Sequence, residues 1–207
     1  TDANGKVRLS DVPPSGTIRV KMSGYRLTEA AVPSTSSTEI YLKPFAAKGV
    51  YLPFGLLANT PKVDALLDLV EKTELNALVV DVKGDRGRLG YASLIPLAKS
   101  IGAPQVKMDL RDLVQKAHAR GIYMIARIVT FKDDPLARAR PDLAIKRANG
   151  QIWVDRENLG WTNPYRREVW DYNISIAKEV AALGFDEVQF DYIRFPSDGS
   201  VTDIVFT

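Results

Sequence analysis

The 207-residue chain contains no cysteine and a single histidine, His118. The missing thiols exclude disulfides, zinc–thiolate sites and thiol nucleophiles. His118 lies near the end of a helix-like stretch, which is more typical of a surface or capping residue than of a metal ligand. The net charge is only +3, and no basic run indicates a nucleic-acid partner. No apolar run approaches the roughly 18 residues of a membrane-spanning helix. We therefore expect a globular protein with no cofactor, no metal, no nucleic-acid partner and no membrane span.

The first 45 residues differ in composition from the rest of the chain. TIRVKM alternates as a short strand does, whereas VPPSG and VPSTSST have the composition of turns or linkers. This predicts a small β-rich N-terminal appendage over 1–45 and a separate domain over 46–207. The chain begins at Thr1 without a signal-like segment, which indicates a processed or trimmed protein.

From residue 48 onward, strand-like and helix-like stretches alternate. Four stretches have the length and composition of buried strands: KGVYL, NALVVDVKG, IYMIARIVTF and GFDEVQFDYIRFP. Helical periodicity separates them. Thr60 is the expected N-cap of the first helix, Asp109 that of the second, and Asn163-Pro164 the expected start of the last.

Nearly continuous apolar strands that alternate with helices are typical of a parallel sheet. No G-x-G-x-x-G follows the first strand, which counts against a dinucleotide-binding fold. We therefore predict an α/β fold of the (β/α)8 TIM-barrel type. Only about the first four βα units are expected here, because a closed barrel takes about 250 residues. The remaining half of the barrel is expected from the rest of a longer chain; the alternatives are a partner that supplies it and a barrel that is broken.

Polar side chains interrupt the predicted strands on one face. Because side chains alternate along a strand, six residues are expected to share the face on which barrel enzymes place their chemistry: Tyr51, Asp81, Lys83, Arg127, Gln189 and Asp191. The structural alternative pairs Asp81 with Lys83 or Arg127. It pairs Asp191 with Arg194. Burying such ion pairs costs several kcal/mol per ion, so charges on the same face of successive strands favour a functional role.

Five stretches resemble a family of bacterial glycoside hydrolases with a TIM-barrel domain related to the α-amylase-like clans: KGVYLPFG, NALVVDVKGDRGRLGY, ARIVTFKDDPLA, IWVD…GWTNP and GFDEVQFDYIRFP. The resemblance covers about residues 46–207, and DYIRFP is its most specific element. It implies hydrolysis of O-glycosidic bonds in a poly- or oligosaccharide. We further expect a bacterial protein of the cell envelope, extracytoplasmic or secreted.

By that resemblance Asp191 takes the position of the catalytic nucleophile or charge stabiliser, and Asp81 that of a carboxylate in the sugar pocket. Aromatic faces stack on sugar rings, and Arg or Lys can fix hydroxyls or an acidic substituent. Four residues of the long segment before the last helix would line the pocket: Trp153, Asp155, Trp161 and Asn163. The other expected substrate contacts are Tyr51, Lys83, Arg127, Gln189, Tyr192 and Arg194. Alternatively, both tryptophans fill the core of that segment.

The last strand departs from the D-x-x-D-x-D-x-E pattern of chitinase-like barrels. With Asp191 aligned on the last Asp, Gln189 takes the place of the middle Asp and Ile193 that of the catalytic Glu. Substrate-assisted chitinase chemistry is therefore disfavoured. The partner acid is expected beyond Thr207, and this chain alone is expected to be inactive. Two alternatives stay open: a non-catalytic carbohydrate- or partner-binding barrel, and, less favoured, a sugar-phosphate enzyme whose phosphate site would follow strands seven and eight.

Overall fold

The structure is a computed structural model that describes residues 2–206. The chain divides into two compact units, Thr1–Ala46 and Ala47–Thr207. In the first unit, β1 (Thr17–Val20) pairs antiparallel with β2 (Thr28–Ala31). The alternating TIRVKM stretch thus contains a strand, as predicted.

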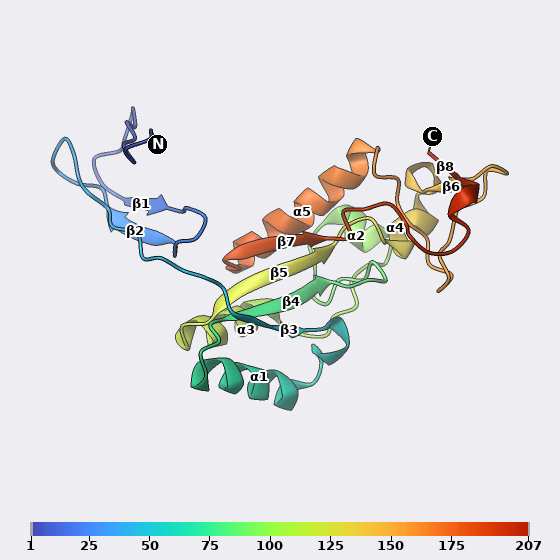
Figure 1. Cartoon of the computed structure of the whole chain (residues 1–207), viewed down its shortest axis with the longest axis horizontal. Helices are drawn as coiled ribbons and strands as arrows, with labels where there is room; N and C mark the ends of the chain where they lie inside the picture. Colours follow the sequence, from blue (N-terminus) through green and yellow to red (C-terminus); the bar gives the residue numbers. More distant parts are fainter. Residues whose placement is uncertain (1, 207) are drawn as a thin grey trace. The chain divides into compact units, whose positions relative to one another are not determined.

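The second unit alternates strands and helices along the chain (Figure 1). Its main elements are β3 (Gly49–Leu52), α1 (Thr60–Lys72), β4 (Ala77–Lys83), α3 (Leu110–Ala119), β5 (Tyr123–Val129), α5 (Arg167–Leu183) and β7 (Glu187–Asp191). Shorter elements lie in the connections: η1 (Phe54–Leu56), α2 (Pro96–Ser100), α4 (Asp134–Ala139), η2 (Pro141–Leu143), β6 (Lys146–Arg147), η3 (Val201–Asp203) and β8 (Ile204–Val205). Among residues 2–206, no helix has both the length and the apolar character required to cross a membrane.

Strands β3, β4, β5 and β7 form one parallel sheet in that order. Spatial order follows chain order, and a helix lies in each crossover, which is the arrangement of successive units in a (β/α)8 barrel. In this register Asp81 lies opposite Arg127, and Arg127 lies opposite Gln189. The predicted fold class, a TIM-barrel type with four of its strands present, is confirmed.

One face of the sheet is apolar and packs against the helices. Its side chains are fully buried: Leu52, Leu78, Val80, Met124, Ala126 and Ile128. Burial of each leucine, isoleucine, valine or methionine side chain stabilises the folded state by about 1.5–3 kcal/mol. This burial fixes which face of each strand meets the helices, and by alternation it directs the intervening residues to the opposite face.

Helix α1 begins one residue earlier than predicted. Its N-cap is Asn59 rather than Thr60, and the Asn59 side chain accepts the backbone N–H of Lys62 at 3.2 Å. An asparagine oxygen caps a helix as well as a threonine hydroxyl does. Residue type alone therefore could not decide between Asn59 and Thr60 as the N-cap. The helix buries one stripe of residues at helical spacing: Val63, Leu67 and Val70.

The later helices show one correct and one incorrect start. Asp109 caps α3 as predicted, accepting the backbone N–H groups of Arg111 and Asp112. Helix α5, in contrast, begins at Arg167, several residues after the predicted Asn163-Pro164. The side-chain oxygen of Asn163 accepts the backbone N–H of Tyr165 at 3.0 Å, which closes a local turn before the helix.

Candidate active site

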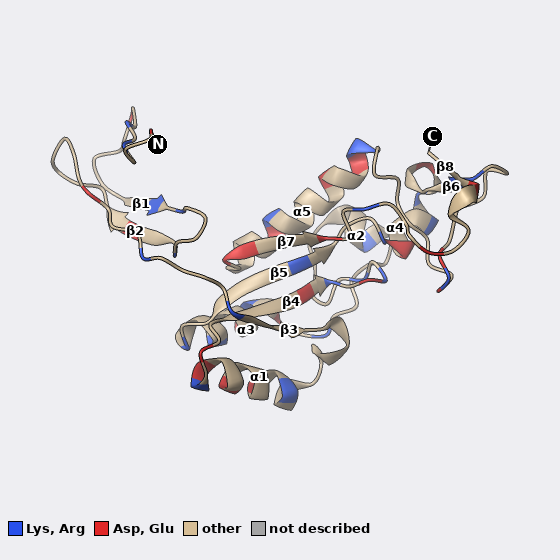
Figure 2. Ribbon diagram, viewed as in Figure 1, with Lys and Arg blue, Asp and Glu red and all other residues tan. Residues whose placement is uncertain are grey.

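Three charged residues meet at the C-terminal ends of β4, β5 and β7. Arg127 on β5 places Nη1 2.5 Å from Oδ1 of Asp81 on β4, and Nη2 2.7 Å from Oδ2 of Asp191 on β7. Its Nε also donates to Asp191 Oδ2 at 2.8 Å. Figure 2 shows the blue segment of β5 between red segments of β4 and β7. One guanidinium therefore bridges two carboxylates from the strands on either side of it.

Asp81 is the more enclosed of the two carboxylates, with a side chain only 6% exposed. Its Oδ2 accepts the hydroxyl of Tyr51 and the backbone N–H of Phe54, the latter at 3.2 Å. Burial raises the pKa of Tyr51, and the hydrogen bond to Asp81 raises it further. Tyr51 therefore stays protonated and donates. With Arg127 on Oδ1, both oxygens of Asp81 are occupied by donors.

Asp191 is more accessible, with 39% of its side chain exposed. Burial alone would raise the pKa of this carboxyl, but the backbone N–H of Tyr192, at 2.6 Å from Oδ1, and the Arg127 guanidinium outweigh burial and lower the pKa. Asp191 is therefore an ionised carboxylate at neutral pH, with part of its surface reachable from solvent. Such a group can act as a nucleophile or charge stabiliser and is unsuited to be a proton donor.

Arg127 keeps its charge despite being largely buried. Burial opposes the cation, but the hydrogen bonds and charges of Asp81 and Asp191 raise its pKa overall. The predicted pairing of Asp81 with Arg127 is present. Asp191, however, pairs with Arg127 rather than with Arg194. The Arg194 guanidinium instead lies 4.8 Å from the ring centroid of Tyr192.

Lys83 does not share the face of Asp81, and its prediction as a substrate contact is corrected. The register between β4 and β5 shifts after Asp81, so that Lys83 lies opposite Ile128. Such a bulge turns the following side chain to the other face. There Lys83 Nζ is fully buried, 2.6 Å from Asp133 Oδ2, and donates to Asn173 Oδ1 at 3.0 Å. No sugar can reach it in this position.

The four residues predicted to line the pocket from the long segment are instead inside the protein. The exposed fractions are 0% for Trp153, 5% for Asp155, 1% for Trp161 and 1% for Asn163. Both indole N–H groups have internal acceptors: the Ser200 carbonyl for Trp153 and Asp155 Oδ2 for Trp161. Of the two interpretations of the tryptophans, the structure supports the core role.

The remaining predicted residues lie around Asp191. Gln189 is exposed beside Arg127 in the register, Tyr192 is half-buried, and Arg194 is exposed. Tyr51, 45% exposed, lies under the guanidinium of Arg127, with its ring centroid 5.5 Å from Cζ. The face predicted by strand alternation therefore exists, without Lys83 and without the four residues of the long segment.

One donor within the site and one buried cation outside it were not predicted from the sequence. The backbone N–H of Phe54 carries no side-chain signal, since any residue supplies that donor. Lys132 pairs with Asp155 at 3.0 Å and with Glu157 at 2.7 Å. Its position just after the third strand could have drawn attention, but its partners are set by the return of the chain more than 20 residues later.

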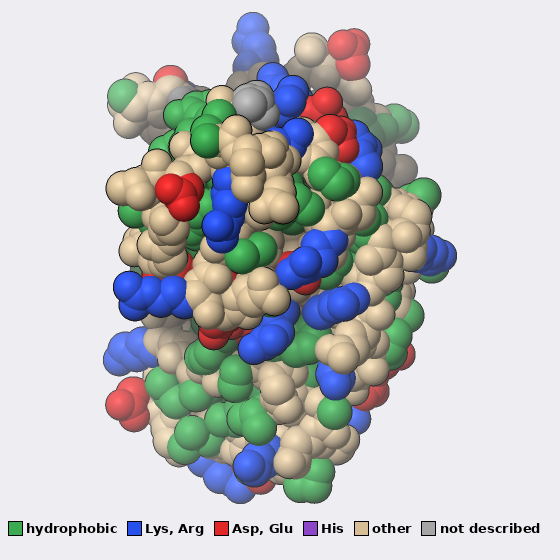
Figure 3. Space-filling view, turned by 90° about the vertical axis from the view of Figure 1, so that its right-hand side faces the viewer, with side chains coloured by type: hydrophobic (Ala, Val, Ile, Leu, Met, Phe, Trp, Pro, Cys, Tyr) green, Lys and Arg blue, Asp and Glu red, His purple; other side chains and the backbone are tan. Residues whose placement is uncertain are grey.

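The surroundings of the site are not acidic. Figure 3 looks onto the side of the molecule toward which the strands run, and several Lys and Arg side chains gather around its middle with few acidic ones between them. Among residues 2–206, no group of three His, Asp or Glu side chains is placed to hold a metal ion. The charged groups that meet at the strand ends are the carboxylates of Asp81 and Asp191 and the guanidinium between them.

A parallel sheet of successive βα units with charged side chains gathered at its strand ends is the arrangement of the (β/α)8 barrel fold. Residues 49–207 match the family described as "Putative glycosyl hydrolase domain". The chain belongs to this family. No curated protein matches the sequence.

Solved structures agree on the fold. A hypothetical protein from Ruminiclostridium thermocellum ATCC 27405 is 41% identical, with a TM-score of 0.72, over 76% of this chain and 81% of that one. An inactive mutant of the exo-β-N-acetylglucosaminidase from Vibrio harveyi is 17% identical, with a TM-score of 0.55, over 89% of this chain and 32% of that one. α-L-Fucosidase isoenzyme 2 from Paenibacillus thiaminolyticus is 14% identical, with a TM-score of 0.51, over 76% and 25%. This chain thus spans about a third or less of those two enzymes.

Proposed function

We propose that this chain supplies the nucleophile half of a glycoside hydrolase active site, with Asp191 as the catalytic nucleophile or charge stabiliser. The observation that carries the proposal is the Arg127 guanidinium shared by Asp81 and Asp191 at the ends of three parallel strands. Membership of the glycosyl hydrolase family supports the reaction class. The proposed substrate is a poly- or oligosaccharide.

The chemistry of glycoside cleavage suits the environment of Asp191. The transition state resembles an oxocarbenium ion, so one carboxylate must stay ionised beside the anomeric carbon. The lowered pKa of Asp191, caused by the Tyr192 N–H and Arg127 against the opposing effect of burial, keeps it in that form. Its partial exposure leaves room for a sugar to approach.

Asp81 and Arg127 would hold the nucleophile in place, and the more exposed Tyr51 would contact the sugar. Arg127 fixes the orientation of Asp191 through two nitrogens, and Asp81 and the Tyr51 hydroxyl in turn fix the guanidinium of Arg127. The second requirement of the reaction is a carboxylic acid that protonates the leaving oxygen. We assign that acid to a residue beyond Thr207.

The test is hydrolysis by the full-length protein on a panel of α- and β-linked polysaccharides. Asp191→Asn keeps the shape and removes the charge, and it is expected to lower kcat by roughly a thousandfold or more, about 4 kcal/mol of barrier. Glu187→Gln is the matched control, since Glu187 lies on the same strand and face, near the other strand end, where it accepts the Tyr123 hydroxyl. Undiminished hydrolysis by Asp191→Asn would remove Asp191 from the mechanism.

A second measurement separates the two roles of Asp191. In Asp191→Gly, added azide can occupy the vacated space and attack the anomeric carbon in place of the carboxylate. Recovery of turnover with a glycosyl azide product supports a nucleophile. If the native protein binds oligosaccharides but hydrolyses none of the substrates, the alternative of a non-catalytic carbohydrate-binding barrel is favoured.

A further inference from the structure

The chain turns sharply where β7 ends at the proposed nucleophile. Tyr192, directly after Asp191, has a φ of 54°. This left-handed conformation costs a residue other than glycine roughly 1–2 kcal/mol. In it, the backbone N–H of Tyr192 donates to Asp191 Oδ1 at 2.6 Å. Contacts elsewhere in the protein must stabilise the turn, because the residue type does not favour it.

The ring of Tyr192 supplies those contacts. It packs against the indole of Trp161, with 5.9 Å between ring centroids and 45° between ring planes. The Arg194 guanidinium lies over both rings, 4.8 Å from the centroid of Tyr192 and 5.3 Å from that of Trp161. The turn after β7 is thus attached to a tryptophan that precedes it by about 30 residues.

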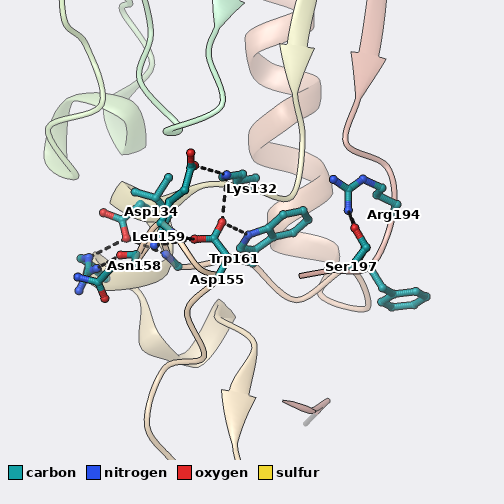
Figure 4. A network of polar contacts seen from close by, with 12 residues as sticks. Lys132, Asp134, Asp155, Asn158, Leu159, Trp161, Arg194 and Ser197 are labelled. Carbon is teal, nitrogen blue, oxygen red and sulfur yellow. Dashed lines mark hydrogen bonds and ion pairs between the residues drawn. The ribbon is translucent and has the colours of Figure 1, made fainter. Parts of the chain in front are cut away.

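Trp161 is itself held by a buried polar network (Figure 4). Its indole N–H donates to Asp155 Oδ2 at 3.0 Å, and Lys132 Nζ lies 3.0 Å from the same oxygen. Asp155 Oδ1 accepts the backbone N–H groups of Glu157 and Leu159 at 2.9 and 3.0 Å. The Asp155 side chain is fully buried. Burial opposes its charge, but these donors lower its pKa, so a fixed anion anchors the indole.

We propose that Trp161 is a positioning residue for Asp191, anchored by Asp155 and acting through the ring of Tyr192. The buried carboxylate fixes the indole, the indole fixes the phenol ring, and the ring holds the turn that directs a backbone N–H at the reacting carboxylate. The inference rests on the proposed function of Asp191. It gives the long segment before α5 a role in catalysis without contact to the sugar.

Trp153 provides a matched control within the same segment. It is also fully buried, and its indole N–H donates to the Ser200 carbonyl at 2.8 Å. Among residues 2–206, Trp161 is the tryptophan whose ring packs on Tyr192. Replacing either tryptophan by leucine removes a buried indole and leaves a cavity. Both variants should therefore lose stability, but only Trp161→Leu removes a ring that contacts Tyr192, the residue next to Asp191.

The test measures the ionisation of Asp191 directly. The pKa of its carboxyl would be followed by carbon NMR in the full-length protein, with the resonance assigned by its loss in Asp191→Asn. In Trp161→Leu the pKa of Asp191 is expected to rise, because the Tyr192 N–H is no longer fixed. In Trp153→Leu it is expected to stay unchanged, although thermal stability falls in both. On any substrate that the native protein hydrolyses, Trp161→Leu should lower kcat about tenfold. The acidic limb of its pH–rate profile should move to higher pH.

Several outcomes would overturn the proposal. An unchanged pKa of Asp191 in Trp161→Leu, or an equal rise in both leucine variants, would reduce Trp161 to a core residue. If Trp161→Leu does not fold, Trp161→Phe keeps a ring and removes the indole N–H, and a smaller rise in the same direction is required. A raised pKa of Asp191 in a protein that hydrolyses nothing would support the positioning role and refute the proposed function.

Discussion

Arg127 is the residue whose replacement tests the arrangement of the site most directly. Arg127→Met keeps most of the apolar stem and removes the cation shared by Asp81 and Asp191. The Arg127 and Asp81 side chains are only 14% and 6% exposed, so the substitution leaves the Asp81 carboxylate buried without its counter-charge. We expect this loss to dominate the stability of the variant.

The two carboxylates contribute unequally to the expected loss. Breaking a buried ion pair from one side costs about 3–5 kcal/mol. Asp81 keeps the donors Tyr51 and Phe54, which favours the lower end, about 3 kcal/mol. Asp191 is 39% exposed, so solvent screening limits its share to about 0.5 kcal/mol. A total of about 3–4 kcal/mol corresponds to a fall in Tm of roughly 10 °C for a unit of this size.

The effect should depend on pH in a defined direction. The folded-state pKa of Asp191 lies below the ordinary value, through the Tyr192 N–H and Arg127 acting against burial. A group of this kind stabilises the fold above the ordinary pKa of an aspartate and loses that contribution as the pH falls through its lowered pKa. The Asp191 share of the difference between native protein and Arg127→Met, about 0.5 kcal/mol, should therefore be fully present near pH 7 and be lost as the pH falls below about 4.

Urea denaturation at pH 7 and at pH 3 measures both quantities. Arg138→Met is the control, because its pair with Asp134 is partly exposed, with 50% of the Arg138 side chain accessible, and should contribute less than about 1 kcal/mol. A loss below about 1 kcal/mol for Arg127→Met at pH 7, or a loss that is larger at pH 3 than at pH 7, would refute the reasoning.

Two further substitutions address the loops behind the site. Lys83→Met leaves the fully buried Asp133 carboxylate without its cation and should cost about 3–5 kcal/mol in urea denaturation; a cost under about 1 kcal/mol would contradict a charged pair there. Gly87→Ala should destabilise more than Gly102→Ala, by at least about 1 kcal/mol in calorimetry: both glycines have positive φ, but a Cβ at Gly87 would collide with Asp133 Oδ1 whereas Gly102 faces open space, so equal losses would count against this contact.

Much of the fold follows from local patterns in the sequence. The apolar runs became β3, β4, β5 and β7, and Asp109 caps its helix as a short acidic side chain should. Strand alternation alone brought Asp81, Arg127 and Asp191 to one face, because the period of a strand is set by backbone geometry. Helix starts were harder to predict: Asn59 and Thr60 are both good N-cap residues, and α5 starts after Arg166, which makes no side-chain cap hydrogen bond.

The partners of the charged residues required the tertiary structure. One extra residue in the β4 register turned Lys83 from the site into the helix layer, and a bulge leaves no distinctive residue pattern in this strand. Asp155 and Trp161 are buried through contacts with Lys132 and with Tyr192 in the loop after β7, which lie more than 20 residues away in the chain.

The sequence by itself thus determined which strands form and, apart from Lys83, which polar side chains lie on the face of the sheet opposite the helices, because both depend on burial and on the two-residue period of a strand. The tertiary structure alone decided which of those charges share a partner and which polar residues are enclosed. Arg127 could have paired with one carboxylate or with two. Only the side-by-side order of β4, β5 and β7 places it between Asp81 and Asp191, because an ion pair forms between neighbours in space.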